Sequence, residues 1–185
     1  MREVRVYTTE LNKSTHAEQH EAGRALLRRA LADGEISPDL AVEIDSNGKP
    51  FLPDAPDFHF SIAHCGNRVV CAVSDVPVGC DLERERVLKR DISRRICSDA
   101  ECAAVRSSAD LFTLWTGKEA VLKAIGLGLR LPLSGIEVGL AETVHLAVND
   151  TPCVLRRTKM EDGWHLAICV VGMDDFAIQL IPTVA

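Results

Sequence analysis

Two acidic residues two positions apart are the first group in this sequence that could carry out chemistry. Asp81 and Glu83 lie in VGCDLE, residues 78–83, whose alternating apolar residues predict a β-strand. Side chains at such positions point to the same face of a strand, so we expect the two carboxylates side by side. That arrangement is typical of a Mg²⁺ site, although a solvated strand face is the alternative. Gly79 would let a ligand approach closely just upstream.

A third carboxylate and two lysines lie on a predicted helix, residues 110–125. Trp115, Glu119 and Lys123 recur at four-residue intervals and therefore form one ridge. Glu119 and Lys123 fall at the border of the apolar arc, where a site between helix and sheet would lie. The alternative is an ordinary Glu–Lys pair on a helix surface. Lys118 falls inside the apolar arc, where an ammonium is costly unless it reaches solvent or an anion, so it is a candidate phosphate contact.

The elements that must position these residues follow from the period of the apolar residues and from the turn signals. The pattern has no regular strand–helix alternation, so it predicts an α+β fold rather than a parallel dinucleotide-binding sheet. Ser98–Glu101 has capping-box spacing and opens a short helix. The other expected elements are a strand at Val4–Tyr7, a helix at 15–32, and strands at 58–62, 69–73, 78–83, 135–139, 143–148, 153–158, 164–171 and 175–181.

Composition narrows the class of protein. The 185 residues carry a net charge of −6, which argues against a general nucleic-acid binder because such proteins need a basic surface. No apolar window approaches the length of a membrane span, and charged Arg2, Glu3 and Arg5 stand where a signal peptide would begin its apolar stretch. Seven cysteines without a C-x-x-C pair indicate reduced, buried thiols. We therefore expect a cytoplasmic protein.

A local basic run stands out against the acidic total. It follows directly on the predicted strand 78–83, and Glu85 and Asp91 interrupt it without cancelling its positive charge. The solvated face of a helix is one explanation, and a docking surface for an acidic partner is the other. Its members are Arg84, Arg86, Lys89, Arg90, Arg94 and Arg95.

Two of these segments together resemble a known family. VGCDLE at 78–83, followed by LWTGKEAVLKAIGLGL at 114–129, resembles the paired signature G-x-D-x-E and W-x-x-K-E-x-x-x-K of the 4′-phosphopantetheinyl transferase superfamily. GKPFLPD at 48–54, FSIAHCG at 60–66 and LPL at 131–133 resemble the surfactin-synthetase-activating, broad-specificity type. The motifs occur in the family's order, which makes a chance match improbable.

The resemblance implies an organisation as well as a fold. It implies two similar α+β subdomains related by a pseudo-twofold, with coenzyme A bound between them in a monomer. We expect an N-terminal subdomain at 1–77 and a C-terminal subdomain at 78–185 that carries the carboxylates of the metal site.

The resemblance also implies roles for individual residues. Asp81, Glu83 and Glu119 resemble the family's Mg²⁺ ligands, and Lys123 resembles its phosphate-binding lysine, so Asp81, Glu119 and Lys123 are the expected catalytic residues. His64 resembles the histidine that holds a phosphate of coenzyme A, and between phosphate and carboxylates it would be pushed toward the protonated form. The alternative for His64 is a hydrogen-bonded histidine at a strand end.

Three further positions complete the expected site. Lys49 and Arg24 are candidate partners for the 3′-phosphate or the adenine end of coenzyme A, and an exposed solubilising role is the alternative for each. Residues before the first helix lack the basic cluster that helps the broad-specificity relatives to grip the nucleotide. Glu101 also matches an acidic position of the family, but its place in a capping box gives it a sufficient structural reason.

The function implied is transfer of the 4′-phosphopantetheine arm of coenzyme A to a serine of an apo acyl or peptidyl carrier protein, with Mg²⁺ on the pyrophosphate. Such carriers serve fatty acid, polyketide or nonribosomal peptide synthesis. Two alternatives stay open at this point. A Mg²⁺-dependent nucleotide pyrophosphohydrolase would use the same carboxylates with water as nucleophile. A non-catalytic carrier-binding protein would keep the fold without the chemistry.

Overall fold

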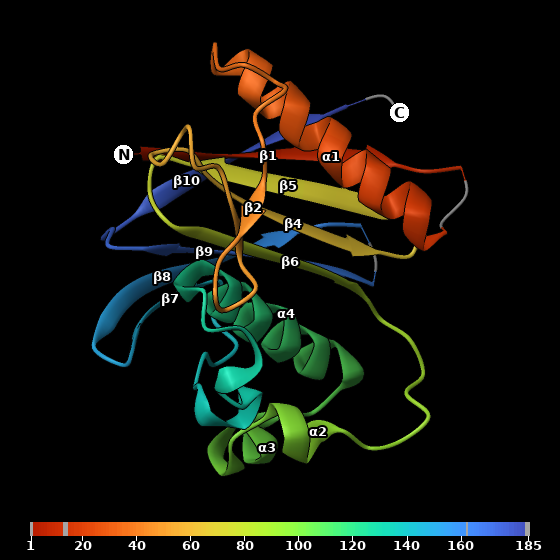
Figure 1. The fold of residues 1–185 in the computed structure, drawn as a ribbon. Coiled ribbons are helices and arrows are strands. Elements are labelled where there is room, and N and C mark those ends of the chain that lie inside the picture. Colours follow the sequence, from red (N-terminus) through yellow and green to blue (C-terminus); the bar gives the residue numbers. More distant parts are fainter. Residues whose placement is uncertain (1, 13–14, 162, 184–185) are drawn as a thin grey trace.

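The computed structural model describes residues 2–12, 15–161 and 163–183, and it is built of four layers (Figure 1). Helix α1, His16–Asp33, covers the outer face of a first sheet, and helix α4, Ser108–Ile125, covers the outer face of a second. The two sheets face each other between the helices. The mixed α+β fold predicted from the sequence is confirmed.

Each sheet has four strands. The first has the order β10-β1-β5-β4, and the second has the order β6-β9-β8-β7. Two short strands form a separate hairpin, and short helices follow β6 and α4. The strands are β1 (Arg2–Glu10), β2 (Glu43–Ile44), β3 (Pro50–Phe51), β4 (His59–Cys65), β5 (Arg68–Ser74), β6 (Val78–Arg84), β7 (Thr143–Val148), β8 (Thr151–Lys159), β9 (Trp164–Val171) and β10 (Phe176–Pro182). The short helices are α2 (Ser93–Ile96), α3 (Asp99–Ala104) and the 3₁₀ turns η1 (Gly128–Arg130) and η2 (Leu133–Gly135).

The last strand returns to the first sheet. β10 runs parallel to β1, with Val4 opposite Ile178, while β5 lies antiparallel on the other side of β1. β6 begins the second sheet at Val78, one residue after the boundary expected at residue 77. The division of the chain into 1–77 and 78–185 stays a prediction, and the strand at 176–182 physically joins the two parts.

Three apolar layers hold the four structural layers together. Leu26 and Leu31 of α1 pack on one face of the first sheet, and Val6 of β1 faces Ile168 of β9 between the sheets. Leu114 of α4 belongs to the third layer, beneath the second sheet. Each central strand lies between two apolar layers, and its successive side chains point alternately into one layer and the other. The central strands are therefore apolar on both faces. Burying a leucine of this kind contributes about 1.5–3 kcal/mol.

Gly79 allows β6 and α4 to pack unusually close together. A Cβ atom at this position would lie 2.1 Å from the carbonyl oxygen of Ala120 and 2.3 Å from the amide nitrogen of Ala124. The interpretation that Gly79 makes room for a ligand is therefore wrong, because the space is taken by the backbone of α4. The same close approach brings the side chains of β6 within reach of those on α4.

The helices expected at 15–32 and 110–125 are present as α1 and α4, although α4 starts two residues earlier than expected, and the predicted capping box of Ser98 and Glu101 is confirmed. Thr15 forms a capping box with Glu18 at the start of α1, and α4 ends at Gly126 with φ of 77°. Within the part of the chain that the structure describes, no helix is long and apolar enough to cross a membrane. All seven cysteines are free, and five are buried, as expected for small apolar residues.

The strand expected at 135–139 is wrong. Leu133–Gly135 forms a 3₁₀ turn, and the next residues are irregular although Ile136 and Val138 are buried as the alternation implied. Side chains satisfy the backbone here in place of a neighbouring strand: the amide of Val138 donates to Glu101 Oε1 at 3.0 Å, and Arg157 donates to the carbonyl of Gly139 at 2.8 Å. Side chains of residues 135–139 are alternately buried and exposed, but the backbone forms no strand.

Candidate active site

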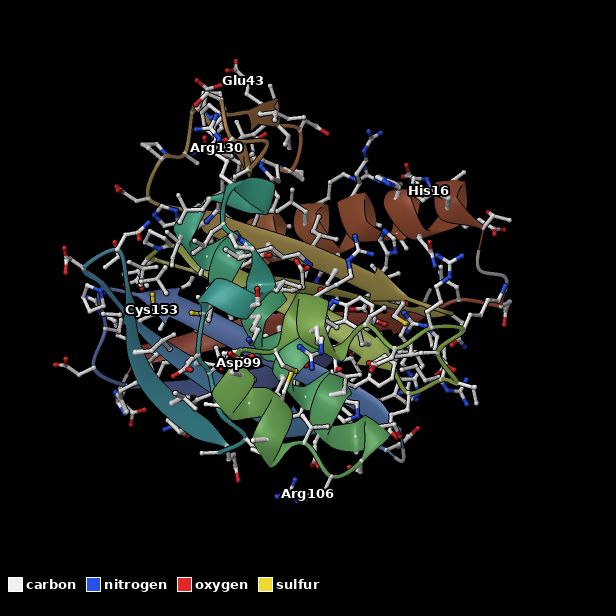
Figure 2. All side chains as sticks on the ribbon, turned by 90° about the horizontal axis from the view of Figure 1, so that it is seen from below. His16, Glu43, Asp99, Arg106, Arg130 and Cys153 are labelled. Carbon is white, nitrogen blue, oxygen red and sulfur yellow. The ribbon has the colours of Figure 1, made fainter. Side chains whose placement is uncertain are left out.

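A cleft opens where the β2–β3 hairpin, β4 and the C-terminal end of α4 meet. Its cavity of about 230 Å³ is lined by Lys49, Ser61, Lys123 and the residues Asn47, Gly48, Pro50, Phe60, Ile62, Leu122, Gly126 and Gly128. Figure 2 shows Arg130 beside the hairpin that carries Glu43, and Arg130 donates a hydrogen bond to the carbonyl of Ser46 at 3.3 Å. The hairpin is thereby attached to the turn that follows α4.

Asp81 and Lys123 form an ion pair at this cleft. Lys123 Nζ donates to Asp81 Oδ1 at 2.6 Å, and Asp81 is only 8% exposed. Burial raises the pKa of Asp81 and Glu83 adds to the effect, while Lys123 opposes both. Burial alone would lower the pKa of Lys123, but the charge of Asp81 and the other acidic groups outweighs it, so the pKa is raised. Lys123 therefore stays charged.

Glu119 adds a second carboxylate from α4. It is half-buried, one helical turn before Lys123. Burial raises the pKa of Glu119, the charges of Asp81 and Glu83 raise it further, and Lys123 lowers it. The ammonium of Lys123 therefore lies near two carboxylates, those of Asp81 and Glu119, and negative charge is in excess around it.

Glu83 lies beside the other two but has its own partners. Arg86 Nη1 lies 2.6 Å from Glu83 Oε2, and the thiol of Cys65 donates to the same oxygen at 3.4 Å. The guanidinium of Arg86 also lies over the rings of Phe112 and Trp115, with its central carbon 5.2 and 5.4 Å from their centroids. Trp115 therefore supports the site through Arg86.

The carboxylates of Asp81, Glu83 and Glu119 fit a hard cation chemically, because all their donors are oxygens and their charges exceed those of the facing amines. Their oxygens are nevertheless not drawn into one tight cluster. Among the described residues, the group of three whose ligand atoms all lie within 4.8 Å of one another is His16, His20 and His64 instead.

Lys49 lies in the cleft, but its ammonium is already bound. Nζ donates to the carbonyl of Ala124 at 2.7 Å and to that of Val78 at 3.4 Å, and burial lowers the pKa of this lysine. Arg24 lies elsewhere: it is exposed on α1 and lines a separate hollow of about 400 Å³ with Arg28. The structure brings Lys49 to Lys123 but does not bring Arg24 to either.

Lys118 does not face the cleft. It is fully buried, and Nζ donates to Glu101 and to the carbonyls of Ile96 at 2.7 Å and Leu133 at 3.0 Å. Burial would raise the pKa of Glu101, but hydrogen bonds from Lys118 and from backbone amides outweigh it, so the pKa is lowered. The anion that the buried Lys118 needed is a carboxylate of this chain, which corrects the interpretation of Lys118 as a phosphate contact.

His64 lies on β4, in contact with two histidines that the sequence reasoning missed. Burial lowers the pKa of His64, and the nearby His20, His16 and Lys123 lower it further. In the protein alone the shift is therefore opposite to the protonation expected beside a phosphate. The signal that could have found the partners is the H-x-x-x-H spacing at 16 and 20 on a predicted helix.

The sequence of this chain is similar to those of known proteins over the region that contains these residues. The sequence model described as the 4′-phosphopantetheinyl transferase superfamily matches residues 77–180. A 4′-phosphopantetheinyl transferase of Bacillus subtilis is 32% identical over 164 residues, which cover 82% of this chain and 73% of the relative. 4′-Phosphopantetheinyl transferase Sfp of Bacillus subtilis strain 168 is 31% identical over 173 residues, which cover 84% of this chain and 77% of the relative. 4′-Phosphopantetheinyl transferase psf-1 of Bacillus pumilus is 33% identical over 159 residues, which cover 80% of this chain and 68% of the relative.

The chain therefore belongs to the 4′-phosphopantetheinyl transferase superfamily. The matched region contains both β6 with its acidic pair and α4 with Glu119 and Lys123. The resemblance seen in the sequence and the enzyme class it implied are confirmed.

Proposed function

We propose that the cleft between the hairpin, β4 and α4 binds coenzyme A and transfers its 4′-phosphopantetheine arm to a serine of a carrier protein. The observation that carries the proposal is the buried Asp81–Lys123 pair beside Glu119, which sets one cation among surplus carboxylates, with Lys123 lining the cavity. Perturbed titratable groups in a cleft are typical of active sites.

The chain's own residues account for the transfer. Lys123, held by Asp81, stabilises negative charge on the pyrophosphate of coenzyme A, and His64 holds a phosphate from β4. The serine oxygen forms a bond to the phosphorus that carries the pantetheine arm, and the bond from that phosphorus to adenosine 3′,5′-bisphosphate breaks. Glu119 accepts the proton of the serine hydroxyl.

We assign Mg²⁺ to Asp81, Glu83 and Glu119. When bound, the ion neutralises the charge of the pyrophosphate. The support for this assignment is the surplus of buried negative charge, which raises the pKa values of Asp81 and Glu119 when only Lys123 balances them. Lys49 is assigned to the coenzyme A side of the cleft, where its stem lines the cavity. Arg24 is retained only as a candidate for the adenine end.

The basic run of residues 84–95 is proposed to receive the carrier protein. Figure 1 shows a long connection between β6, which ends at Arg84, and α2, which contains Arg94 and Arg95. Arg84 and Arg86 are occupied with Trp164 and Glu83, whereas Arg90, Arg94 and the other members are exposed. An acidic helix of a carrier would complement these free guanidinium groups.

The organisation of the protein is proposed along the same lines. Each of the two four-stranded sheets is covered by an 18-residue helix, although the first sheet takes β10 from the C-terminal half, and this repeated arrangement supports a pseudo-twofold relation within one chain. Seven free cysteines support a cytoplasmic location.

Intact-mass measurement tests the proposed function. An apo acyl carrier protein and an apo peptidyl carrier domain are each incubated with coenzyme A, Mg²⁺ and the enzyme, and at least one should gain the mass of one phosphopantetheine group. The matched control is a carrier whose acceptor serine is replaced by alanine. Breakdown of coenzyme A at the same rate without any carrier would instead identify a pyrophosphohydrolase. Carrier binding without a mass gain would identify a non-catalytic protein.

A further inference from the structure

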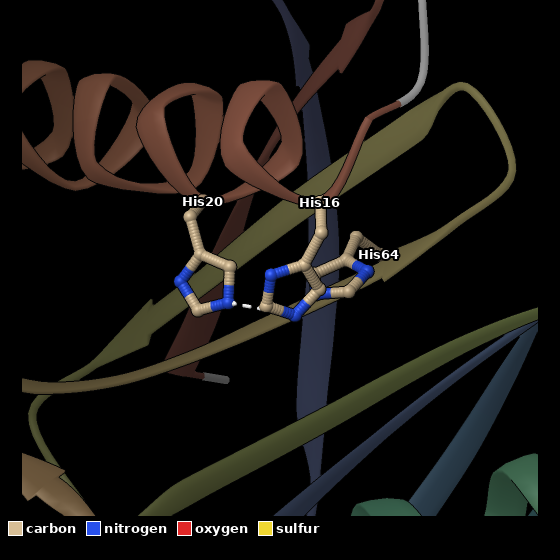
Figure 3. Close-up of side chains that lie close together, drawn as sticks. All are labelled: His16, His20 and His64. Atoms are coloured by element: carbon tan, nitrogen blue, oxygen red, sulfur yellow. Dashed lines mark hydrogen bonds between the residues drawn. The ribbon is translucent and has the colours of Figure 1, made fainter.

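Three histidines outside the carboxylate group converge at the start of α1. His16 and His20 come from α1 and His64 from β4, and Figure 3 shows their rings turned toward one another. One nitrogen from each lies within 4.8 Å of the others, and the Nε2 atoms of His16 and His20 are 3.3 Å apart. The ring centroids are 4.3 Å apart for His16–His20, 5.9 Å for His16–His64 and 5.8 Å for His20–His64.

The fold holds these rings in place. His16 and His20 are four residues apart and therefore share one face of α1. Gln19 Nε2 donates to the carbonyl of Gly66 at 2.7 Å, which ties the first turns of the helix to the turn after β4. Gly23 lets α1 approach β4 closely, since a Cβ there would be 2.9 Å from Ile62 Cγ2. The packing of α1 against β4 thus brings the residues that carry the three imidazoles close together.

The spacing suits a transition metal ion. Zn–N bonds of about 2.0–2.1 Å in a tetrahedral site place two ligand nitrogens roughly 3.3 Å apart. The His16–His20 separation of 3.3 Å has this value; in the protein alone the two nitrogens share a hydrogen bond, whose proton a bound ion would replace. Three neutral imidazoles with a fourth position open to solvent are a ligand set for Zn²⁺, Cu²⁺ or Ni²⁺, whereas Mg²⁺ prefers oxygen.

We infer that His16, His20 and His64 form a binding site for a divalent transition ion of the Zn²⁺ class, distinct from the carboxylate site and in competition with the proposed contact between His64 and a phosphate of coenzyme A. The ion bridges the first turns of α1 to β4 and therefore stabilises the folded chain. Cys65 is not part of the site: it is next to His64 on the strand and so points to the opposite face, where its thiol meets Glu83.

Metal titration of the untagged, full chain tests the inference. Zn²⁺ is added in competition with a chromogenic chelator, and one ion is expected to bind per chain and to raise the melting temperature. His20→Asn should weaken binding at least tenfold. The matched control is His145→Asn, which removes an exposed histidine of β7 and should bind like the unmodified chain.

A second probe separates histidine from cysteine ligands. Co²⁺ bound by the three imidazoles should give visible d–d bands without the strong near-ultraviolet absorption of a cobalt–thiolate bond. Undiminished Zn²⁺ affinity in both His16→Asn and His20→Asn, or a thiolate band with Co²⁺, would overturn the site. So would phosphate binding that depends on these histidines in a chain that does not bind Zn²⁺. None of these readouts depends on transferase activity, so a failed site would leave the proposed function intact.

Discussion

Two lysines five positions apart on α4 have opposite kinds of surroundings. Lys118 is fully buried, and all its hydrogen-bond partners belong to the chain: one carboxylate, Glu101, and two carbonyl groups. The side chain of Lys123 is 34% exposed and lines a cleft, and the carboxylates of both Asp81 and Glu119 act on its charge. The same residue type on the same helix therefore serves two different purposes.

The difference lies in whether the charges balance. Around Lys118 the one ammonium meets one carboxylate, and backbone groups satisfy the remaining donors, so the pair has nothing left to offer a ligand. Around Lys123 the carboxylates are in excess, and burial raises the pKa values of Asp81 and Glu119. A balanced buried pair holds a fold together, whereas an unbalanced one at a cleft can bind a cation or take up a proton.

The largest effect should come from breaking the balanced pair. Lys118→Met leaves Glu101 buried without its cation, which we expect to lower the free energy of unfolding by about 3–5 kcal/mol. Denaturant titration followed by circular dichroism measures this change. The double variant with Glu101→Gln should lose less, because it removes the uncompensated charge. Equal losses in both variants would show that lost packing, and not the unpaired carboxylate, dominates.

Removing a carboxylate from the unbalanced group should act on catalysis. Asp81→Ala is expected to reduce transfer by roughly 10²–10³-fold, because it removes both the partner of Lys123 and a proposed Mg²⁺ ligand. The fold should stay intact, since the lost charge was repelled by its neighbours. Steady-state assays with the carrier at millimolar Mg²⁺ measure the loss. Asp54→Ala, at an exposed position, is the matched control, and a wild-type rate in Asp81→Ala would remove this residue from the site.

A smaller effect should appear in the stability of the metal-free protein. Because the pKa of Glu119 is raised on folding, its contribution to stability is present below the unfolded-state pKa and is lost as pH rises through the folded-state pKa. Glu119→Gln, which cannot ionise, should therefore melt about 2–4 °C higher than the unmodified chain at neutral pH in chelator. The difference should vanish toward acid pH.

Added Mg²⁺ sharpens the same comparison. It should raise the melting temperature of the unmodified chain more than that of Glu119→Gln, since only the former keeps all three proposed ligands. Thermal scans from neutral to acid pH, with and without the ion, give both results. A lower melting temperature for the variant at neutral pH would mean that its surroundings stabilise the ionised carboxylate of Glu119, which would contradict the prediction.

The smallest effect concerns the carrier. Charge reversal at Arg90 and Arg94 should raise the Michaelis constant for the carrier a few-fold at low salt and leave that for coenzyme A unchanged, because surface charges mainly steer association and are screened by ions. Reversal of Arg28 and Arg29, which pair with acidic residues on α1, is the matched control. If only the control impaired carrier kinetics, the docking surface would lie on α1.

Much of the fold could be predicted because its signals are local. The strands at 143–148 and 164–171 match the structure at both ends, and the helix expected at 110–125 ends at Ile125 as predicted. The acidic pair on β6 and the ridge on α4 were also visible as spacing. Periodicity and capping act over a few residues, so the sequence carries them directly.

The remainder depends on residues far apart in the chain. The pairing of Lys118 with Glu101 joins α4 to α3, so the buried lysine and the capping glutamate looked like separate features. The meeting of His64 with His16 depends on how α1 crosses β4, and the strand expected at 135–139 fails because Glu101 takes one of its amides. Tertiary contacts decided each of these, and no local pattern encodes them.

The most direct test of the account compares the two lysines in one assay. Lys118→Met and Lys123→Met are each mixed in excess with an apo carrier, coenzyme A and Mg²⁺, and single-turnover transfer is followed by intact mass and normalised to the folded fraction. Lys123→Met should lose roughly 10²-fold or more in rate, while folded Lys118→Met should stay within about threefold of the unmodified enzyme. A fully active Lys123→Met, or a folded Lys118→Met as impaired as Lys123→Met, would contradict the assignment of catalysis to the unbalanced pair.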